Sequence, residues 1–172
     1  MKITEINDSI RPNIRDFFTT NWGSAIMVSR GKSHRIDELP GFVAMEANHL
    51  LGLITYNIED EECEIVSLDS LVKNQGVGSR LLECVVKMAE EKRSRRVWLI
   101  TSNDNLHAMR FYQKRGFNMV ALYVNAINAA RKIKPEIPKF GNDGIPLRHE
   151  IEFELNLSES SADGQEFHVS HC

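Results

Sequence analysis

The sequence predicts a single α/β domain with a mixed central sheet and helices on both faces. Strand-like apolar stretches follow one another in the first third of the chain, as in an antiparallel meander. From residue 62 onward, strand-like stretches alternate with amphipathic helices, as in parallel units. A chain of 172 residues is long enough to bury one sizeable core. We expect this domain to cover residues 1–157, followed by a polar, disordered tail over residues 158–172.

Each expected element follows from hydrophobic periodicity and from the Gly, Pro and Asn residues that interrupt it. The expected strands cover residues 25–28, 42–47, 50–56, 62–69, 96–101, 117–124 and 150–157. The expected helices cover residues 11–20, 103–115 and 126–133, and one more runs from a Gly-rich loop at 73–78 to about residue 92. Residues 29–40 are expected to form a polar loop.

Two of these elements are expected at the centre of the domain. The helix after the Gly-rich loop has apolar residues at three- and four-residue steps, namely Leu81, Leu82, Val85, Met88 and Ala89. One of its faces therefore packs on the sheet. The strand 62–69 is mostly apolar beyond Glu64, as expected of a central strand that is buried on both faces.

Composition and charge exclude several classes of function. The net charge of -3 and the pI of about 6.1 give no electrostatic reason for general nucleic-acid binding. No stretch approaches the roughly 18 apolar residues of a membrane span, and the N-terminus lacks the apolar region of a secretory signal. The three cysteines are widely spaced, which disfavours a disulfide framework and favours a reducing compartment. We therefore expect a cytoplasmic protein that binds neither nucleic acid nor membranes.

The histidines indicate neither a metal site nor a nucleophile–base pair. His168, His171 and Cys172 have ligand-like spacing, but they lie in the polar tail, so we expect no metal site there. The other histidines form no recognisable triad and are expected at surface or hydrogen-bonded positions. These are His34, His49, His107 and His149.

The expected buried strand and the helix after it are joined by a Gly-rich segment, Lys73-Asn74-Gln75-Gly76-Val77-Gly78-Ser79-Arg80. The start of a helix carries unpaired backbone amides and a partial positive charge, and glycines let a phosphate approach these amides closely. A diphosphate can therefore bind to the amides of residues 75–79, with Lys73 or Arg80 adding charge. The alternative is a tight turn whose glycines serve only packing. The segment lacks the third glycine of a dinucleotide fingerprint and the Gly-Lys-Ser/Thr ending of a P-loop, which disfavours NAD and ATP.

A second motif lies one strand and one turn later and reads Asn105-Leu106-His107-Ala108-Met109-Arg110-Phe111-Tyr112-Gln113-Lys114-Arg115-Gly116-Phe117. Taken alone, it is a helix with an apolar side, an Asn at its start and a Gly after its end. That interpretation explains Gly116 fully and Asn105 in part. It does not explain why this motif follows the Gly-rich segment in the same chain.

Together, the two motifs resemble those of the GCN5-related N-acetyltransferase (GNAT) family. The pyrophosphate loop of that family runs Gln/Arg-x-x-Gly-x-Gly/Ala, and its second motif runs Asn-x-x-Ala-x-x-Phe-Tyr-x-x-x-Gly-Phe. Every fixed position of the second motif is matched, whereas Lys73 stands at the Gln/Arg position and Ser70 stands where many members have Pro. The resemblance covers roughly residues 41–124. It implies the acyl-CoA N-acyltransferase fold, in which the sheet is splayed between the fourth and fifth expected strands, 62–69 and 96–101.

The resemblance further implies that acetyl-CoA is the cosubstrate and that its acetyl group passes directly to a primary amine in a ternary complex. The residues of the implied cofactor site are Leu68, Lys73, Gln75, Gly76, Val77, Gly78, Ser79, Arg80, Asn105, Phe111 and Tyr112. In this site Asn105 would hydrogen-bond the pantetheine arm, and Tyr112 would lie beside the thioester sulfur. The pantetheine would fill the gap between the splayed strands.

Acyl transfer to an amine needs a base, a donor for the developing negative charge and a stabilised thiolate. We expect the donor to be the backbone amide near Leu68. Tyr112 either protonates the thiolate or only positions the sulfur, because a phenol with a pKa of about 10 is a poor acid for a thiolate of about 8.5. Glu64 is the expected base and Asp69, at the other end of the strand, is its competitor, although either could be purely structural. Without a bulge in the strand, Glu64 shares a face with Val66 and Leu68.

The acceptor is expected opposite the cofactor, between the first helix and the final hairpin. Candidate residues are Asn21, Trp22, Asn142 and Asp143. The loop 140–146, which contains the last two, suits a rigid binding turn and equally suits a plain connection. The amine could belong to a small molecule or a peptide, and the resemblance is compatible with a homodimer. Two other functions remain open, namely a catalytically silent acyl-CoA-binding regulatory module and a nucleotide-binding protein.

Overall fold

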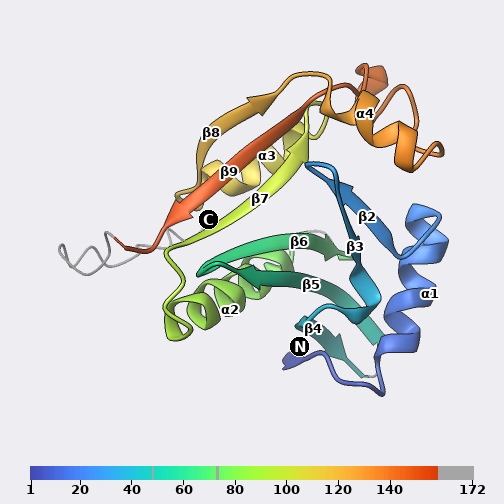
Figure 1. The fold of residues 1–172 in the computed structure, drawn as a ribbon. Coiled ribbons are helices and arrows are strands. Elements are labelled where there is room, and N and C mark those ends of the chain that lie inside the picture. The colour runs from blue at the N-terminus through green and yellow to red at the C-terminus, as the bar shows by residue number, and fades with distance from the viewer. Residues whose placement is uncertain (48, 73, 159–172) are drawn as a thin grey trace.

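The computed structural model describes residues 1–47, 49–72 and 74–158 of the chain. At its centre lies a seven-stranded mixed sheet (Figure 1). From one edge to the other, its strands are β1 (Lys2–Glu5), β4 (Gly41–Glu46), β5 (His49–Glu59), β6 (Glu62–Ser70), β7 (Arg96–Ser102), β9 (Glu150–Asn156) and β8 (Asn118–Tyr123). Neighbouring strands are antiparallel except β6 and β7, which are parallel. A helix connects these two strands, as a parallel pair requires.

Helices cover both faces of the sheet, which confirms the predicted fold class. On one face lie α2 (Val77–Glu91) and α3 (Leu106–Gln113), and on the other lies α1 (Arg11–Trp22) (Figure 1). The face with α1 also carries a two-stranded hairpin of β2 (Ile26–Ser29) and β3 (Lys32–Arg35). The last helix, α4 (Ala126–Ile133), lies near the end of β8 and the start of β9.

Each face of the sheet has its own apolar core. The larger core lies under α2 and contains Leu81 and Val85 of that helix together with Ile65 of β6. The smaller core lies under α1 and contains Ile14 and Phe18 of that helix. Because β6 contributes side chains to both cores, its sequence is apolar on both faces, as a central strand requires.

The pairing of β6 with β7 ends well before either strand does. Residues 62–65 of β6 pair with residues 96–99 of β7, after which β6 continues to Ser70 and β7 to Ser102 without further pairing to each other. On its other side, β7 remains paired with β9 over its whole length. The predicted splay is therefore confirmed, and it leaves a gap that widens toward the carboxyl ends of β6 and β7.

A β-bulge lies in β6 where the gap begins. Across β5 and β6, Thr55 faces Ser67 whereas Tyr56 faces Ile65, so Val66 is an extra residue in β6. The side-chain oxygens of Thr55 and Ser67 are buried and hydrogen-bond to each other at 2.7 Å. This bond fixes the two strands beside the bulge, so the bend in β6 has one defined position.

Two short strands differ from the sequence prediction. Residues 29–40, expected as a polar loop, contain β3, and β1 at the start of the chain was not predicted. The segment Lys32–Arg35 has no apolar residue, so periodicity cannot reveal it as a strand. It forms because Arg30 and Gly31, with φ of 48° and 74°, make the tight turn that pairs it with β2. The other predicted elements are present, and their ends shift by up to about three residues.

Leu81 tests the packing of α2 on the sheet, because it is fully buried there. We expect Leu81→Ala to lower the free energy of unfolding by about 2–5 kcal/mol, since it removes apolar contacts and leaves a cavity. Chemical denaturation measures this change. Leu106→Ala is the matched control because Leu106 is 56% exposed, and it should cost less than about 0.5 kcal/mol. Equal effects of the two substitutions would contradict the described packing.

Candidate functional site

The gap between β6 and β7 faces backbone groups of β6 that have no strand partner. The amide of Leu71 donates to the carbonyl of Leu51 on β5 at 2.8 Å. Alternation along the strand then directs the backbone groups of residues 67, 69 and 71 toward β5. The amides of Leu68 and Ser70, which lie between these residues, point into the gap. An extended ligand that carries its own amides can bind there as an additional strand.

The Gly-rich segment follows β6 at the open end of this gap. Asn74 and Gly76 have φ of 59° and 70°, and Gly76 precedes α2 without a side-chain cap. Among the residues that the structure describes, no acceptor binds the amides of residues 75–79. These amides and the positive end of the helix dipole together form a site for an anion. Arg80 is exposed beside them, whereas Lys73 lies outside the described residues.

The first turn of α2 contacts α3. A Cβ on Gly78 would lie 3.5 Å from the ring of Phe111, an ordinary contact, so packing within the protein does not require a glycine there. Arg115 joins the two helices by donating to the carbonyl of Phe111 at 2.7 Å and to the hydroxyl of Ser79 at 2.5 Å. Sequence reasoning missed Arg115, because it occupies a variable position of the second motif. Its charge adds to the positive potential at the anion site.

Helix α3 brings Asn105 and Tyr112 toward the gap. The side-chain oxygen of Asn105 accepts a hydrogen bond from the amide of Ala108 at 3.1 Å, while its side-chain NH₂ group donates to no described residue. Tyr112 is buried and packs edge-on against Phe117. Burial, with a smaller contribution from the charge of Asp69, raises the pKa of the Tyr112 phenol. Tyr112 therefore keeps its proton at neutral pH.

The bulge places two carboxylates on the same face of β6. Ile65 and Leu68 both belong to the core under α2, whereas Glu64 and Asp69 point to the face with α1, where Glu64 meets the β2–β3 hairpin. Glu64 would share a face with Leu68 only in a strand without a bulge, and that condition does not hold here. The extra residue, Val66, shifts the alternation of the strand by one position.

Both carboxylates have raised pKa values because they are withdrawn from water. Burial raises the pKa of Glu64 to about 7, against the opposing charges of Lys32 and Arg30. Burial also raises the pKa of Asp69 to about 6, which the side chain of Trp22 offsets in part. At pH 7 Glu64 is therefore close to half ionised, which suits a group that exchanges protons with a substrate.

The β2–β3 hairpin covers Glu64. Nε2 of His34 lies 3.4 Å from Oε2 of Glu64, and the two side chains are only 10% and 8% exposed. Burial, together with the charge of Lys32, lowers the pKa of His34, so the imidazole is neutral at pH 7. The expectation of a surface or hydrogen-bonded position is wrong for His34, because its Nε2 is buried and bonds to no described residue. Sequence spacing does not reveal this pair, which forms only when the hairpin folds over β6.

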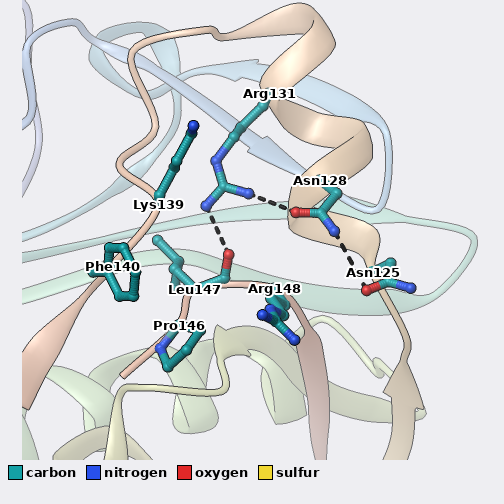
Figure 2. Close-up of a pocket in the computed structure, with 8 residues that line it drawn as sticks. All are labelled: Asn125, Asn128, Arg131, Lys139, Phe140, Pro146, Leu147 and Arg148. Carbon is teal, nitrogen blue, oxygen red and sulfur yellow. Dashed lines mark hydrogen bonds between the residues drawn. The ribbon is translucent and has the colours of Figure 1, made fainter. Parts of the chain in front are cut away.

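Two pockets lie near these elements. The first, of about 430 Å³, is lined by the β2–β3 hairpin, by the turn between β5 and β6 and by the start of β7, and it includes Glu64. The second, of about 480 Å³, lies between α4 and the segment 139–148 (Figure 2). Arg131 reaches across the second pocket from α4 to the carbonyl of Leu147, and it also bonds to the side chain of Asn128. The second pocket has no lining group that accepts a proton near pH 7.

The residues that the sequence predicted for the acceptor lie on two segments, the end of α1 and the loop between α4 and β9. Trp22 ends α1 and is 53% exposed beside Asp69. Asn21 donates its side-chain amide to the carbonyl of Phe17 in its own helix at 2.8 Å. At the end of the first helix, the Trp22 side chain is exposed and interacts with Asp69, and the amide of Asn21 is bonded within the helix.

Asn142 and Asp143 lie on the loop that connects α4 to β9. Asn142 donates its backbone and side-chain amides to the carboxylate of Asp104, at 2.7 and 2.8 Å. A Cβ on the preceding Gly141 would lie 2.0 Å from that carboxylate, so only glycine fits there. Asp104 thus fastens the loop to the end of β7, and Asn142 is used in that contact. Asp143 is exposed, with φ of 55°.

The described part of the chain has no helix long and apolar enough to cross a membrane. Within the same residues, no three His, Cys, Asp or Glu side chains are grouped so that they could hold a metal ion. Cys63 is buried, Cys84 is half-buried, and both are free thiols. The terminal residues His168, His171 and Cys172 lie outside the described range.

Comparison with known proteins agrees with this geometry. A family model described as "Acetyltransferase (GNAT) family" matches residues 7–117, more than half of the chain. The uncharacterized protein YdhI of Bacillus subtilis (strain 168) is 43% identical over 154 residues, which are 89% of this chain and 96% of YdhI. Two solved structures share the fold. They are an IAA acetyltransferase from Bacillus cereus ATCC 14579 (18% identity, TM-score 0.71, 91% of this chain and 99% of that chain) and a GNAT family acetyltransferase from Elizabethkingia anophelis with acetyl-CoA bound (20% identity, TM-score 0.63, 91% and 97%).

The raised pKa of Glu64 predicts a pH-dependent cost to stability. The pKa is about 7 in the folded protein against an ordinary value of 4.5, so the folded state binds this proton more tightly than the unfolded state does. The wild-type protein therefore loses stability as the pH rises from about 4.5 to about 7, and Glu64→Gln does not incur this loss. We expect Glu64→Gln to be more stable than the wild type by about 1–3 kcal/mol at pH 8, and nearly equal to it at about pH 4.5. Urea unfolding at both pH values measures the difference, and a variant less stable than the wild type at pH 8 would contradict a desolvated carboxylate.

Proposed function

The chain belongs to the GNAT acetyltransferase family, and we propose on this premise that it transfers the acetyl group of acetyl-CoA to a primary amine. The transfer is direct, in a ternary complex of protein, acetyl-CoA and amine. One observation carries the proposal: the gap between β6 and β7 has an anion site at its open end and, at its closed end, a buried carboxylate with a pKa of about 7. The acetyl-CoA bound to the Elizabethkingia protein of the same fold supports the choice of cosubstrate.

The residues around the gap fit acetyl-CoA. The amides of residues 75–79 would receive the pyrophosphate, with Arg80 adding charge. Gly78 supports this assignment, because its missing Cβ opens the first turn of α2 although packing against Phe111 does not require a glycine. The side-chain NH₂ group of Asn105 would donate to the pantetheine arm, which lies in the gap as an additional strand.

The chemical step forms a C–N bond and breaks a C–S bond. An ammonium group first gives one proton to Glu64, directly or through a water, and the neutral amine then attacks the thioester carbonyl. The amide of Leu68 donates to the carbonyl oxygen as it becomes negative. The departing thiolate takes the second proton of the amine and accepts a hydrogen bond from Tyr112. Because its pKa is raised, Tyr112 is a weak acid for a thiolate of about 8.5, which favours a positioning role for it.

Glu64 is the better candidate for the base than Asp69. Its pKa of about 7 matches a neutral working pH, and it lines a recess that an acceptor can enter. Asp69 has a pKa of about 6 and lies nearer to Tyr112 and Trp22, toward the Gly-rich segment. In that position the charge of Asp69 adds to the effect of burial and raises the pKa of the Tyr112 phenol.

Acetyl-CoA should raise the temperature of unfolding. A ligand at 100 times its Kd stabilises the folded state by about 2.7 kcal/mol, which a thermal shift assay detects readily. ATP and NAD serve as controls and should give no comparable rise. An equal rise with ATP, or none with acetyl-CoA at saturation, would contradict the proposal. A rise specific to acetyl-CoA without turnover of any amine would instead indicate a catalytically silent acyl-CoA-binding regulatory module.

The pH dependence of kcat/KM tests Glu64 as the base. For the wild type, kcat/KM should fall as the pH drops below about 7, because the carboxylate becomes protonated. Glu64→Gln should remove this acid limb and lower kcat/KM at pH 8 by about 10²- to 10⁴-fold. Glu61→Gln, at a carboxylate that is 75% exposed in the nearby turn, is the matched control and should keep the wild-type profile. An unchanged profile for Glu64→Gln would remove Glu64 from the mechanism.

A further inference from the structure

The recess beside Glu64 holds more negative charge than its cations neutralise. Each lining cation already has a carboxylate partner: Lys32 pairs with Glu59 at 2.8 Å, Arg30 with Glu152 at 3.5 Å, and Arg95 with Glu62 at 3.6 Å. Two lining carboxylates, Glu64 and Asp60, are within ion-pair distance of no lysine or arginine in the described chain. The neighbour of Glu64 is His34, which is neutral at pH 7. The recess therefore has two places for a positive charge from a ligand.

A buried hydroxyl in the lining independently indicates a ligand. Ser29 is only 9% exposed and lines the recess near Glu64. Its Oγ is buried and interacts with the carboxylate of Glu64, whose pKa it lowers, but this contact falls short of a well-formed hydrogen bond. Buried hydroxyls in folded proteins normally have a partner. An ammonium or amine group at Glu64 can donate to this oxygen and so supply the partner.

The two unpaired carboxylates lie on different segments of the recess, Glu64 on β6 and Asp60 in the turn that follows β5. Glu64 faces Asn57 across β5 and β6, and Asp60 follows Asn57 by three residues. At about 3.3 Å per residue, the backbone of Asp60 is about 10 Å along the hairpin from the level of Asn57 and Glu64. That separation matches an aliphatic chain of several carbons with a nitrogen at each end.

From these contacts we propose that the recess under the β2–β3 hairpin binds the acceptor, and that the acceptor is a linear aliphatic amine with a second positive charge at its far end. The inference rests on the proposed acetyltransferase function. The first nitrogen lies at Glu64 and Ser29, gives one proton to Glu64 and becomes acetylated. The second nitrogen keeps its charge and lies at Asp60. An acceptor with a carboxylate at its far end is disfavoured, because that carboxylate would meet Asp60.

Three probes of equal chain length test this proposal: diaminohexane, hexylamine and aminohexanoate, whose far ends are cationic, apolar and anionic. We expect kcat/KM with acetyl-CoA to be highest for diaminohexane and lowest for aminohexanoate. Asp60→Asn should reduce the preference for diaminohexane over hexylamine by about fivefold, the effect of one partly exposed ion pair. Asp60 has φ of 51°, which asparagine adopts as readily as aspartate, so the turn is kept. High salt should reduce the preference in the wild type as well.

Glu61→Gln is the matched control, because Glu61 lies in the same turn with φ of 62° but does not line the recess. It should keep the preference for diaminohexane. If the wild type uses hexylamine or aminohexanoate as well as diaminohexane, or if Asp60→Asn keeps the full preference, the proposal is wrong.

Calorimetry separates this inference from the proposed function. The three probes are titrated into the protein with and without CoA, so that the recess is tested even if no acetyl transfer occurs. Suppose that the protein binds diaminohexane, that Asp60→Asn weakens this binding, and that acetyl-CoA does not bind. The proposed acetyltransferase function would then be wrong, and the proposed amine site in the recess would stand. If the protein transfers acetyl groups equally well to all three probes, the proposed function stands and the proposed amine site in the recess is wrong.

Discussion

The early end of the backbone pairing between β6 and β7 is the constraint on which the rest of the site depends. A parallel sheet normally satisfies every backbone group of a central strand, yet β6 is paired with β7 only at residues 62–65. The bulge at Val66 marks this point, and the bond between Thr55 and Ser67 holds it in place. Beyond it, the amides of β6 that point into the gap need a partner. The fold thus leaves a slot that an extended ligand can enter, and the free amides at the start of α2 lie at the open end of that slot.

The face of β6 toward α1 carries the two carboxylates with raised pKa values, Glu64 and Asp69. The bulge turns Glu64 and Asp69 to one side, and the β2–β3 hairpin then shields Glu64 from water. Shielding costs stability when the carboxylate is ionised, and a tightly paired cation would remove that cost. Its neighbours are instead a neutral imidazole, His34, and the hydroxyl of Ser29. The protein therefore keeps a carboxylate that is poised to take up a proton, as proton transfer from an amine requires.

The sequence predicted the parts of the site that depend on local backbone geometry. Gly76 could be assigned to the start of a helix, and Asn105 to a helix cap, because such positions have strong residue preferences within a few residues. The segment Lys32–Arg35 could not be recognised as a strand, because it has no apolar residue and forms only by pairing with β2. Whether Glu64 and Leu68 share a face could not be decided for a similar reason. A bulge adds a single residue to a strand, and the pattern of mostly apolar residues in β6 is nearly the same with or without it.

The sequence alone determined the fold class through its hydrophobic periodicity, and the splay between two central strands through the resemblance that its two motifs carry. It also placed free amides at the start of α2. The tertiary structure decided which side chains meet across the sheet. The 3.4 Å approach of His34 to Glu64 joins residues thirty positions apart, and the recess gathers side chains from five strands and from the segments that connect them. The pKa of a carboxylate also depends on how much water the surrounding elements exclude. That exclusion is a property of the packed hairpin and sheet, and no single segment of the chain carries it.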